Sequence, residues 1–116
     1  MTTSPESAAQ RQLDGYNTRN IDLFCSAYSK DIVLLDLVSG IVFCIGIEQL
    51  REKYNIQFDK CVELRCELSK RIVCGNIVID EEYVSGLVVG KIVHATAIYE
   101  IQNGLICRGW FVRGNE

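Results

Sequence analysis

The second half of the chain is an almost unbroken series of strand-like segments separated by tight-turn dipeptides. The segments cover residues 62–73, 77–84, 91–101 and 105–112, with Gly75-Asn76, Ser85-Gly86 and Asn103-Gly104 between them. Asn-Gly between two β-rich runs is the strongest short-range hairpin signal. Consecutive hairpins pair neighbouring strands antiparallel, so this half of the chain predicts a long antiparallel sheet.

The first half contains three amphipathic helical patterns. The first pattern begins at Ser4 and Pro5, which suit a helix start, and the second follows Asn20, a residue favoured at N-caps. The third follows Gly46. The apolar positions recur at helical spacing, and they are Ala9, Leu13, Tyr16, then Ile21, Phe24, Cys25, Tyr28, then Leu50, Tyr54 and Phe58. Such short helices need a sheet to cover them.

Two further strands are predicted at residues 32–37 and 41–45, before the third helix. Strands followed by hairpins, with helices gathered on one face, predict an α+β fold in which a curved, mainly antiparallel sheet wraps around three helices. A cone of this kind has one open end, which is a natural pocket for a small molecule. The 116 residues suit one domain covering residues 1–116, with a loose N-terminus at residues 1–4.

Charge and cysteine usage narrow the class of protein. The formal net charge is -3, and the twelve basic residues are scattered without a basic run, so we expect no nucleic-acid and no membrane partner. Six cysteines lie mostly in apolar runs without C-x-x-C spacing, and no apolar signal sequence precedes them. Reduced thiols in a cytoplasmic protein are therefore expected. A single histidine without a nearby ligand set argues against a metal site, and no cofactor is expected.

One acidic residue interrupts an apolar strand. In "IVLLDLVSG", Asp36 follows four apolar residues and precedes a Ser-Gly turn. An ionised carboxylate in apolar surroundings is unfavourable unless it finds a partner or its pKa rises. Asp36 is therefore a candidate functional group. The alternative is a carboxylate held at the strand end by turn N–H groups or by an arginine.

Several segments resemble the nuclear transport factor 2-like superfamily, most closely its SnoaL-like and ketosteroid-isomerase-type branch. They are "AAQRQLDGYNTRNIDLFCSAYSKDIVLLDL", "GIEQLREKY" and the final hairpin "AIYEIQNGLICRGWF". The resemblance covers nearly the whole chain and implies a cone-shaped cystatin-like α+β barrel. It leaves the chemistry open, because members include isomerases, cyclases, dehydratases, hydrolases and binding modules.

The resemblance also implies site residues. Asp36 stands where the isomerase keeps its general base, whereas Gln12 and Ala97 stand where it keeps its two oxyanion donors. Tyr99 is the leading replacement donor, so the catalytic prediction is Asp36 with Tyr99. Ligand contacts are predicted from the inward faces of helices and strands, namely Gln12, Tyr16, Phe24, Tyr54, Phe58, Ala97, Gly109, Phe111 and Arg113.

The opposite face of the predicted sheet is unusually apolar. Alternation places Ile92, Thr96, Ile98, Ile106, Trp110 and Val112 on this convex face, together with the single histidine, His94. Large apolar patches on a protein surface usually mark an interface. We therefore predict a homodimer through the convex face, with Ile98 and Trp110 near its centre, as the resemblance also implies.

Three functions are compatible with this sequence. The leading one is binding of a small, mostly apolar molecule, with cofactor-free isomerisation or dehydration in which Asp36 is the base. The second is a non-catalytic binding or dimerisation module in which Asp36 pairs with Arg113. A weaker third possibility is epoxide hydrolysis by an arrangement including Arg71 and Asp80. The run Asp80-Glu81-Glu82 is interpreted as a solvated hairpin end.

Overall fold

A computed structural model describes residues 4–114 of the chain. Met1–Thr3, most of the segment expected to be loose, lie outside the described residues. Within residues 4–114 three helices and six strands follow one another. In chain order they are α1 (Pro5–Thr18), α2 (Ile21–Ser26), β1 (Tyr28–Asp36), β2 (Val42–Ile45), α3 (Ile47–Lys60), β3 (Arg65–Cys74), β4 (Ile77–Ser85), β5 (Val93–Gln102) and β6 (Leu105–Arg113).

The helices begin where the sequence predicts. Ser4 is the N-cap of α1 with Pro5 directly after it, and the Asn20 side chain accepts a hydrogen bond from the Leu23 N–H at the start of α2. α2 is shorter than predicted, because the chain turns after Ser26 and Tyr28 becomes the first residue of β1. At this turn the chain pairs with β6, because the Ile106 N–H donates a hydrogen bond to the Ala27 carbonyl at 2.9 Å.

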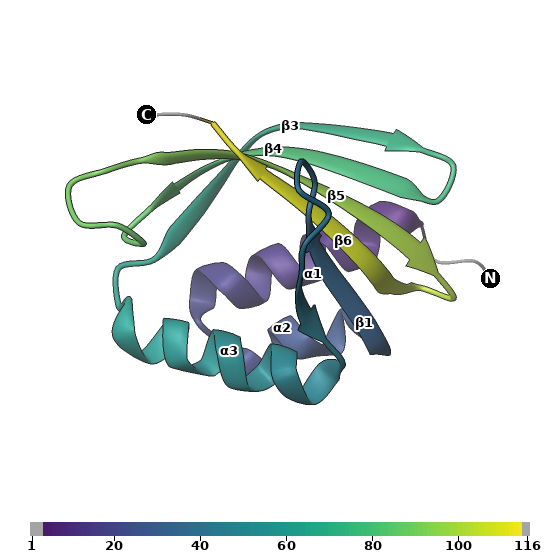
Figure 1. Ribbon diagram of the computed structural model, residues 1–116, viewed down its shortest axis with the longest axis horizontal. Coiled ribbons are helices and arrows are strands. Elements are labelled where there is room, and N and C mark those ends of the chain that lie inside the picture. Colours follow the sequence, from purple (N-terminus) through teal and green to yellow (C-terminus); the bar gives the residue numbers. More distant parts are fainter. Residues whose placement is uncertain (1–3, 115–116) are drawn as a thin grey trace.

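The six strands form one sheet in the order β2-β1-β6-β5-β4-β3. The predicted hairpins β3–β4, β4–β5 and β5–β6 are all antiparallel, as is β1–β2. β1 pairs with β6 in parallel, which joins the two halves of the chain into one sheet. Figure 1 shows the sheet arching over the three helices, which all lie on its concave side. The fold is therefore α+β, as expected.

Alternation along β4 and β5 determines which side chains face the helices. Ala97 and Tyr99 are buried on the concave face, as the pattern predicts. On β4, Val78 is opposite Tyr99 and Asp80 is opposite Ala97. The buried residues of this strand, which all lie on the same concave face, are Val78, Asp80, Glu82 and Val84. The interpretation of residues 80–82 as a solvated hairpin end is wrong, because Asp80 is 0% and Glu82 8% exposed.

A β-bulge in β6 corrects the predicted convex face. The register between β5 and β6 shifts between Glu100 and Ile101, so that Cys107 has no opposite residue. Ile106 therefore points into the core and is fully buried, whereas the sequence placed it on the convex face. From Gly109 to Phe111 the alternation agrees with the prediction, because a bulge inserts one extra residue and reverses the faces only on one side of it. Val112, also predicted on the convex face, is among the residues that line the cavity.

An aromatic cluster joins the helices beneath the sheet. Phe24 of α2 lies 4.7 Å from Tyr54 and 5.5 Å from Phe58 of α3 between ring centroids, and 6.2 Å from Tyr16 of α1. α1 and α2 approach so closely that a Cβ at Gly15 would collide with the Phe24 backbone. This close packing holds the helices as a firm floor beneath the concave face.

Candidate functional site

A cavity of about 490 Å³ lies between the concave face of the sheet and the helices. Its walls come from α1, α3 and the strands, with further contributions from the β1–β2 and β4–β5 connections. The lining residues are Gln12, Leu13, Tyr16, Tyr28, Asp36, Val38, Phe43, Lys53, Cys66, Glu82, Val84, Leu87, Val93, Ala95, Tyr99, Phe111, Val112 and Arg113. Most are apolar or aromatic, so the few polar groups determine what the cavity can bind.

Glu82 is the buried acid of this cavity. It lies opposite Ala95 on β5, and only 8% of the residue is exposed. Burial raises the pKa of Glu82 from 4.5 to about 7, and the neighbouring negative charge of Asp80 acts in the same direction. The Cys66 thiol, a hydrogen-bond donor to the carboxylate, and the more distant Arg71 offset this in part. A carboxyl group with such a pKa can exchange protons near neutral pH.

Three tyrosines surround the interior of the cavity. Tyr16 comes from α1, Tyr28 from β1 and Tyr99 from β5. Burial raises the pKa of each phenol, with the negative charge of Glu82 contributing to all three. They are therefore neutral hydrogen-bond donors at neutral pH. The Tyr28 hydroxyl donates to Oε1 of Gln12 at 3.4 Å, a long hydrogen bond that a ligand could replace.

Asp36 is at the rim of the cavity, where β1 ends. Its Oδ2 accepts a hydrogen bond from the Ser39 backbone N–H at 2.8 Å, and this contact lowers the pKa of Asp36 below its ordinary value. No ion pair with Arg113 forms among the described residues. The carboxylate therefore holds the β1–β2 turn, which is the first alternative that the sequence left open.

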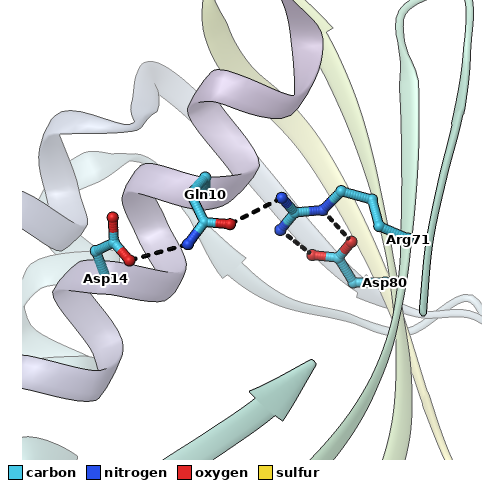
Figure 2. A network of polar contacts seen from close by, with 4 residues as sticks. All are labelled: Gln10, Asp14, Arg71 and Asp80. Carbon is cyan, nitrogen blue, oxygen red and sulfur yellow. Dashed lines mark hydrogen bonds and ion pairs between the residues drawn. The ribbon is translucent and has the colours of Figure 1, made fainter. Parts of the chain in front are cut away.

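A second buried acid lies on the same strand, outside the cavity. Asp80 accepts two hydrogen bonds from Arg71, Nε to Oδ1 at 2.7 Å and Nη2 to Oδ2 at 3.0 Å. Figure 2 shows that Gln10 of α1 extends this network, accepting from Arg71 at 2.9 Å and donating to Asp14 at 2.9 Å. The pair links α1 to β3 and β4. Because neither Arg71 nor Asp80 lines the cavity, the epoxide-hydrolase possibility gains no support.

The residues predicted from the sequence fall into two sets. Six of them line the cavity, namely Gln12, Tyr16, Asp36, Tyr99, Phe111 and Arg113. The other five lie behind its wall, namely Phe24, Tyr54, Phe58, Ala97 and Gly109. The first three of these fill the aromatic cluster. The space beside Gly109 is filled by the Leu34 side chain and is not open to a ligand, since a Cβ at position 109 would come within 2.8 Å of Leu34 Cδ2.

Sequence reasoning missed Glu82 and Tyr28. For Glu82 a signal was present. In a strand, residues 78, 80, 82 and 84 share one face, and the apolar Val78 and Val84 mark that face as the buried one. Pairing this strand with the next one assigns Glu82 to the face of Ala95 and Tyr99. For Tyr28 the helical spacing was misleading, because Tyr28 belongs to β1.

The described part of the chain contains neither a metal-ligand cluster nor a membrane-spanning helix. No cluster of three or more His, Cys, Asp or Glu residues with the proximity needed for a metal ion occurs in residues 4–114. None of the helices there combines the length and hydropathy needed to cross a bilayer. The six cysteines are free thiols, and Cys25, Cys44 and Cys66 are buried.

Comparisons with known proteins agree on the fold. The profile of the SnoaL-like domain matches residues 9–109. No curated protein sequence matches the chain. Among solved structures, an uncharacterised cystatin-fold protein from Novosphingobium aromaticivorans superposes with a TM-score of 0.87 at 20% identity, over 97% of this chain and 100% of that one.

Two further solved structures resemble the chain. An NTF2-like protein of unknown function from Cytophaga hutchinsonii has a TM-score of 0.80 at 13% identity, covering 98% of this chain and 93% of that one. The second is a hypothetical protein with a ketosteroid isomerase-like fold from Catenulispora acidiphila, in complex with trimethylamine. Its TM-score is 0.77 at 16% identity, covering 95% of this chain and 86% of that one. At these identities the likeness concerns the fold alone.

Proposed function

The chain belongs to the SnoaL-like domain family, and from this premise we propose that its cavity binds a small, mostly apolar molecule and transfers a proton within it through Glu82. The observation that carries the proposal is the Glu82 carboxyl group, 8% exposed, with a pKa raised to about 7 in an aromatic cavity. A related fold in complex with trimethylamine supports a small occupant.

The proposed reaction class is proton transfer next to a carbonyl, as in isomerisation or dehydration. Ionised Glu82 would accept a proton from the carbon beside the carbonyl and return it to another position of the same molecule. A neutral phenol of Tyr16, Tyr28 or Tyr99 would donate a hydrogen bond to the oxygen as negative charge develops on it. Such chemistry needs no cofactor. The protein environment that gives Glu82 a pKa near neutrality suits a base of this kind.

The proposal moves the base from Asp36, which the sequence favoured, to Glu82. Asp36 is committed to the Ser39 N–H and has a lowered pKa, so it is a weak base at the cavity rim. Deuterium exchange of the protons beside the carbonyl, followed by NMR for a panel of lipophilic ketones, measures the proposed chemistry directly. We expect Glu82→Gln to reduce exchange by about 100-fold or more, whereas Asp36→Asn retains it.

The outcomes separate the candidate bases. Exchange that survives in Glu82→Gln and disappears in a folded Asp36→Asn variant would restore Asp36 as the base. Ketone binding without exchange in the wild-type protein would leave a non-catalytic binding module. The wild-type rate is expected to rise with pH through about 7, as Glu82 ionises.

We also propose a homodimer through the convex face of the sheet. A row of apolar residues crosses all six strands at matched register, and it consists of Ile72, Ile79, Ile98, Trp110, Leu35 and Val42. Ile98 lies opposite Trp110 near its middle, as the sequence suggested. Burying such a row against a second copy would remove it from water. Light scattering after size-exclusion chromatography should give a dimer for the wild type and a monomer for Ile98→Lys.

A further inference from the structure

The interior of the cavity contains an acid that forms no ion pair in the described chain, although Lys53 and Arg113 also line the cavity. None of the ion pairs within residues 4–114 includes Glu82. Arg71 is engaged by Asp80 through two hydrogen bonds, and the Cys66 thiol is a weak donor. An unpaired carboxylate at this depth is unfavourable in its ionised form. A ligand that brings a positive charge would therefore gain binding energy from Glu82.

Aromatic side chains line the same cavity as Glu82. Tyr16, Tyr28, Tyr99, Phe43 and Phe111 all line the cavity. The face of an aromatic ring is negative, and it attracts cations, organic ammonium ions above all. The protein already contains one such contact, because Lys53 Nζ lies 5.4 Å from the centroid of the Phe43 ring. The cavity as a whole also contains Asp36, Lys53 and Arg113, but the rings together with the unpaired Glu82 form a site complementary to a cation that is apolar at its surface.

We propose that the preferred ligand of this cavity is a small organic ammonium ion, such as a tertiary or quaternary alkylamine, with its nitrogen near the Glu82 carboxylate and its alkyl groups against the aromatic rings. This inference rests on the proposed function, since it names the class of molecule that the same cavity takes. A primary ammonium ion fits less well, because it is more strongly hydrated and the few acceptors of this mostly apolar cavity replace only part of that hydration.

The charge of the ligand determines whether protons are released or taken up on binding, and this can be measured. A cation beside Glu82 favours its ionised form, so binding lowers the pKa of Glu82 and releases protons near pH 7. A neutral ketone that accepts a hydrogen bond from protonated Glu82 does the opposite and takes protons up. The titratable or charged groups that act on Glu82 or are acted on by it are Tyr16 from α1, Tyr28 from β1, Tyr54 from α3, Cys66 and Arg71 from β3, Asp80 from β4 and Tyr99 from β5. Asp36 from β1, Lys53 from α3 and Arg113 from β6 also line the cavity.

The test uses two probes of the same shape that differ in charge. Choline and 3,3-dimethyl-1-butanol share a hydroxyl arm and a three-methyl head, and only choline is a cation. Isothermal titration at pH 7 in two buffers of different ionisation enthalpy gives the affinity and the number of protons released. We expect choline to bind at least about tenfold more tightly than the alcohol, with proton release. Glu82→Gln should abolish both the preference and the proton release, while the affinity for the alcohol is retained.

A second variant pair keeps the test independent of Glu82. Tyr16→Phe retains an aromatic face and should retain the choline preference, whereas Tyr16→Leu should reduce it several-fold. Equal binding of the two probes by the wild type, or a preference that persists in Glu82→Gln, overturns the ammonium proposal. Binding of the alcohol and of neutral ketones without any choline preference also overturns it, yet leaves the proposed function intact. If neither probe nor any lipophilic ketone binds, the proposed function itself fails.

Discussion

Asp80 and Glu82 project from the same face of β4, two positions apart, and both are buried. Asp80 meets a bidentate arginine that is itself held by Gln10, so its charge is satisfied inside the protein. Glu82 meets tyrosines and a thiol, and it forms no ion pair within the described chain. The difference separates two uses of a buried acid. One pair ties a helix to the sheet, and the other acid is left available to a ligand.

The largest effect is expected when the paired acid loses its arginine. Arg71→Met leaves the Asp80 carboxylate buried without a partner, and we expect urea denaturation to show a loss of about 3–5 kcal/mol. Arg65→Met, on the exposed face of the same strand, should change stability by less than about 0.5 kcal/mol. The double variant Arg71→Met/Asp80→Leu should recover most of the loss. Full stability of Arg71→Met alone would mean that the pair is not what secures β4.

Removing the charge of the unpaired acid should have the opposite sign. The pKa of Glu82 is raised from 4.5 to about 7, so between these values the folded protein keeps a proton that the unfolded chain has released. Stability therefore falls as pH rises through this window, by on the order of 3 kcal/mol, and is level above it. Glu82→Gln cannot ionise, so it should match the wild type at pH 4 and exceed it at pH 8 in urea denaturation.

The control for this variant is Glu67→Gln, because Glu67 is exposed on β3. It should keep the pH dependence of the wild type. A wild-type fall in stability that persists unchanged in Glu82→Gln would show that another group causes it.

The smallest effect belongs to the acid at the rim. Asp36→Ala removes the acceptor for the Ser39 N–H, so thermal unfolding at pH 7 should begin at a lower temperature, by less than in Arg71→Met. The pKa of Asp36 is lowered in the folded state, so its contribution is present above the unfolded value and is lost as pH falls. At a pH well below the folded-state pKa of Asp36, the difference in stability between the variant and the wild type should therefore be smallest. Ser39→Ala keeps the backbone N–H but removes the hydroxyl contact, so it should retain only part of the pH-dependent contribution.

The sequence predicted the fold better than the site. Period-2 alternation and the Asn103-Gly104 turn are local properties, and they were sufficient to place the strands and the concave side of β5. The burial of Glu82 depends on which strands flank it and on what the helices leave uncovered, and neither is encoded within "IDEEYV" itself. The bulge at Cys107 likewise follows from how β6 meets β1 and β5 together, which reversed the predicted side of Ile106.

The parallel pairing of β1 with β6 also bears on how the chain reaches its fold. Leu34 of β1 is opposite Gly109 of β6, so one edge of β1 stays without a partner strand until β6 is in place. Closing a loop of about two thirds of the chain is slow, and contacts far apart in sequence reduce folding rates. On the ribosome, β3–β5 can form hairpins as they emerge. The sheet that walls the cavity is complete only when β6 has paired with both β5 and β1, so we expect the cavity to form after the local hairpins.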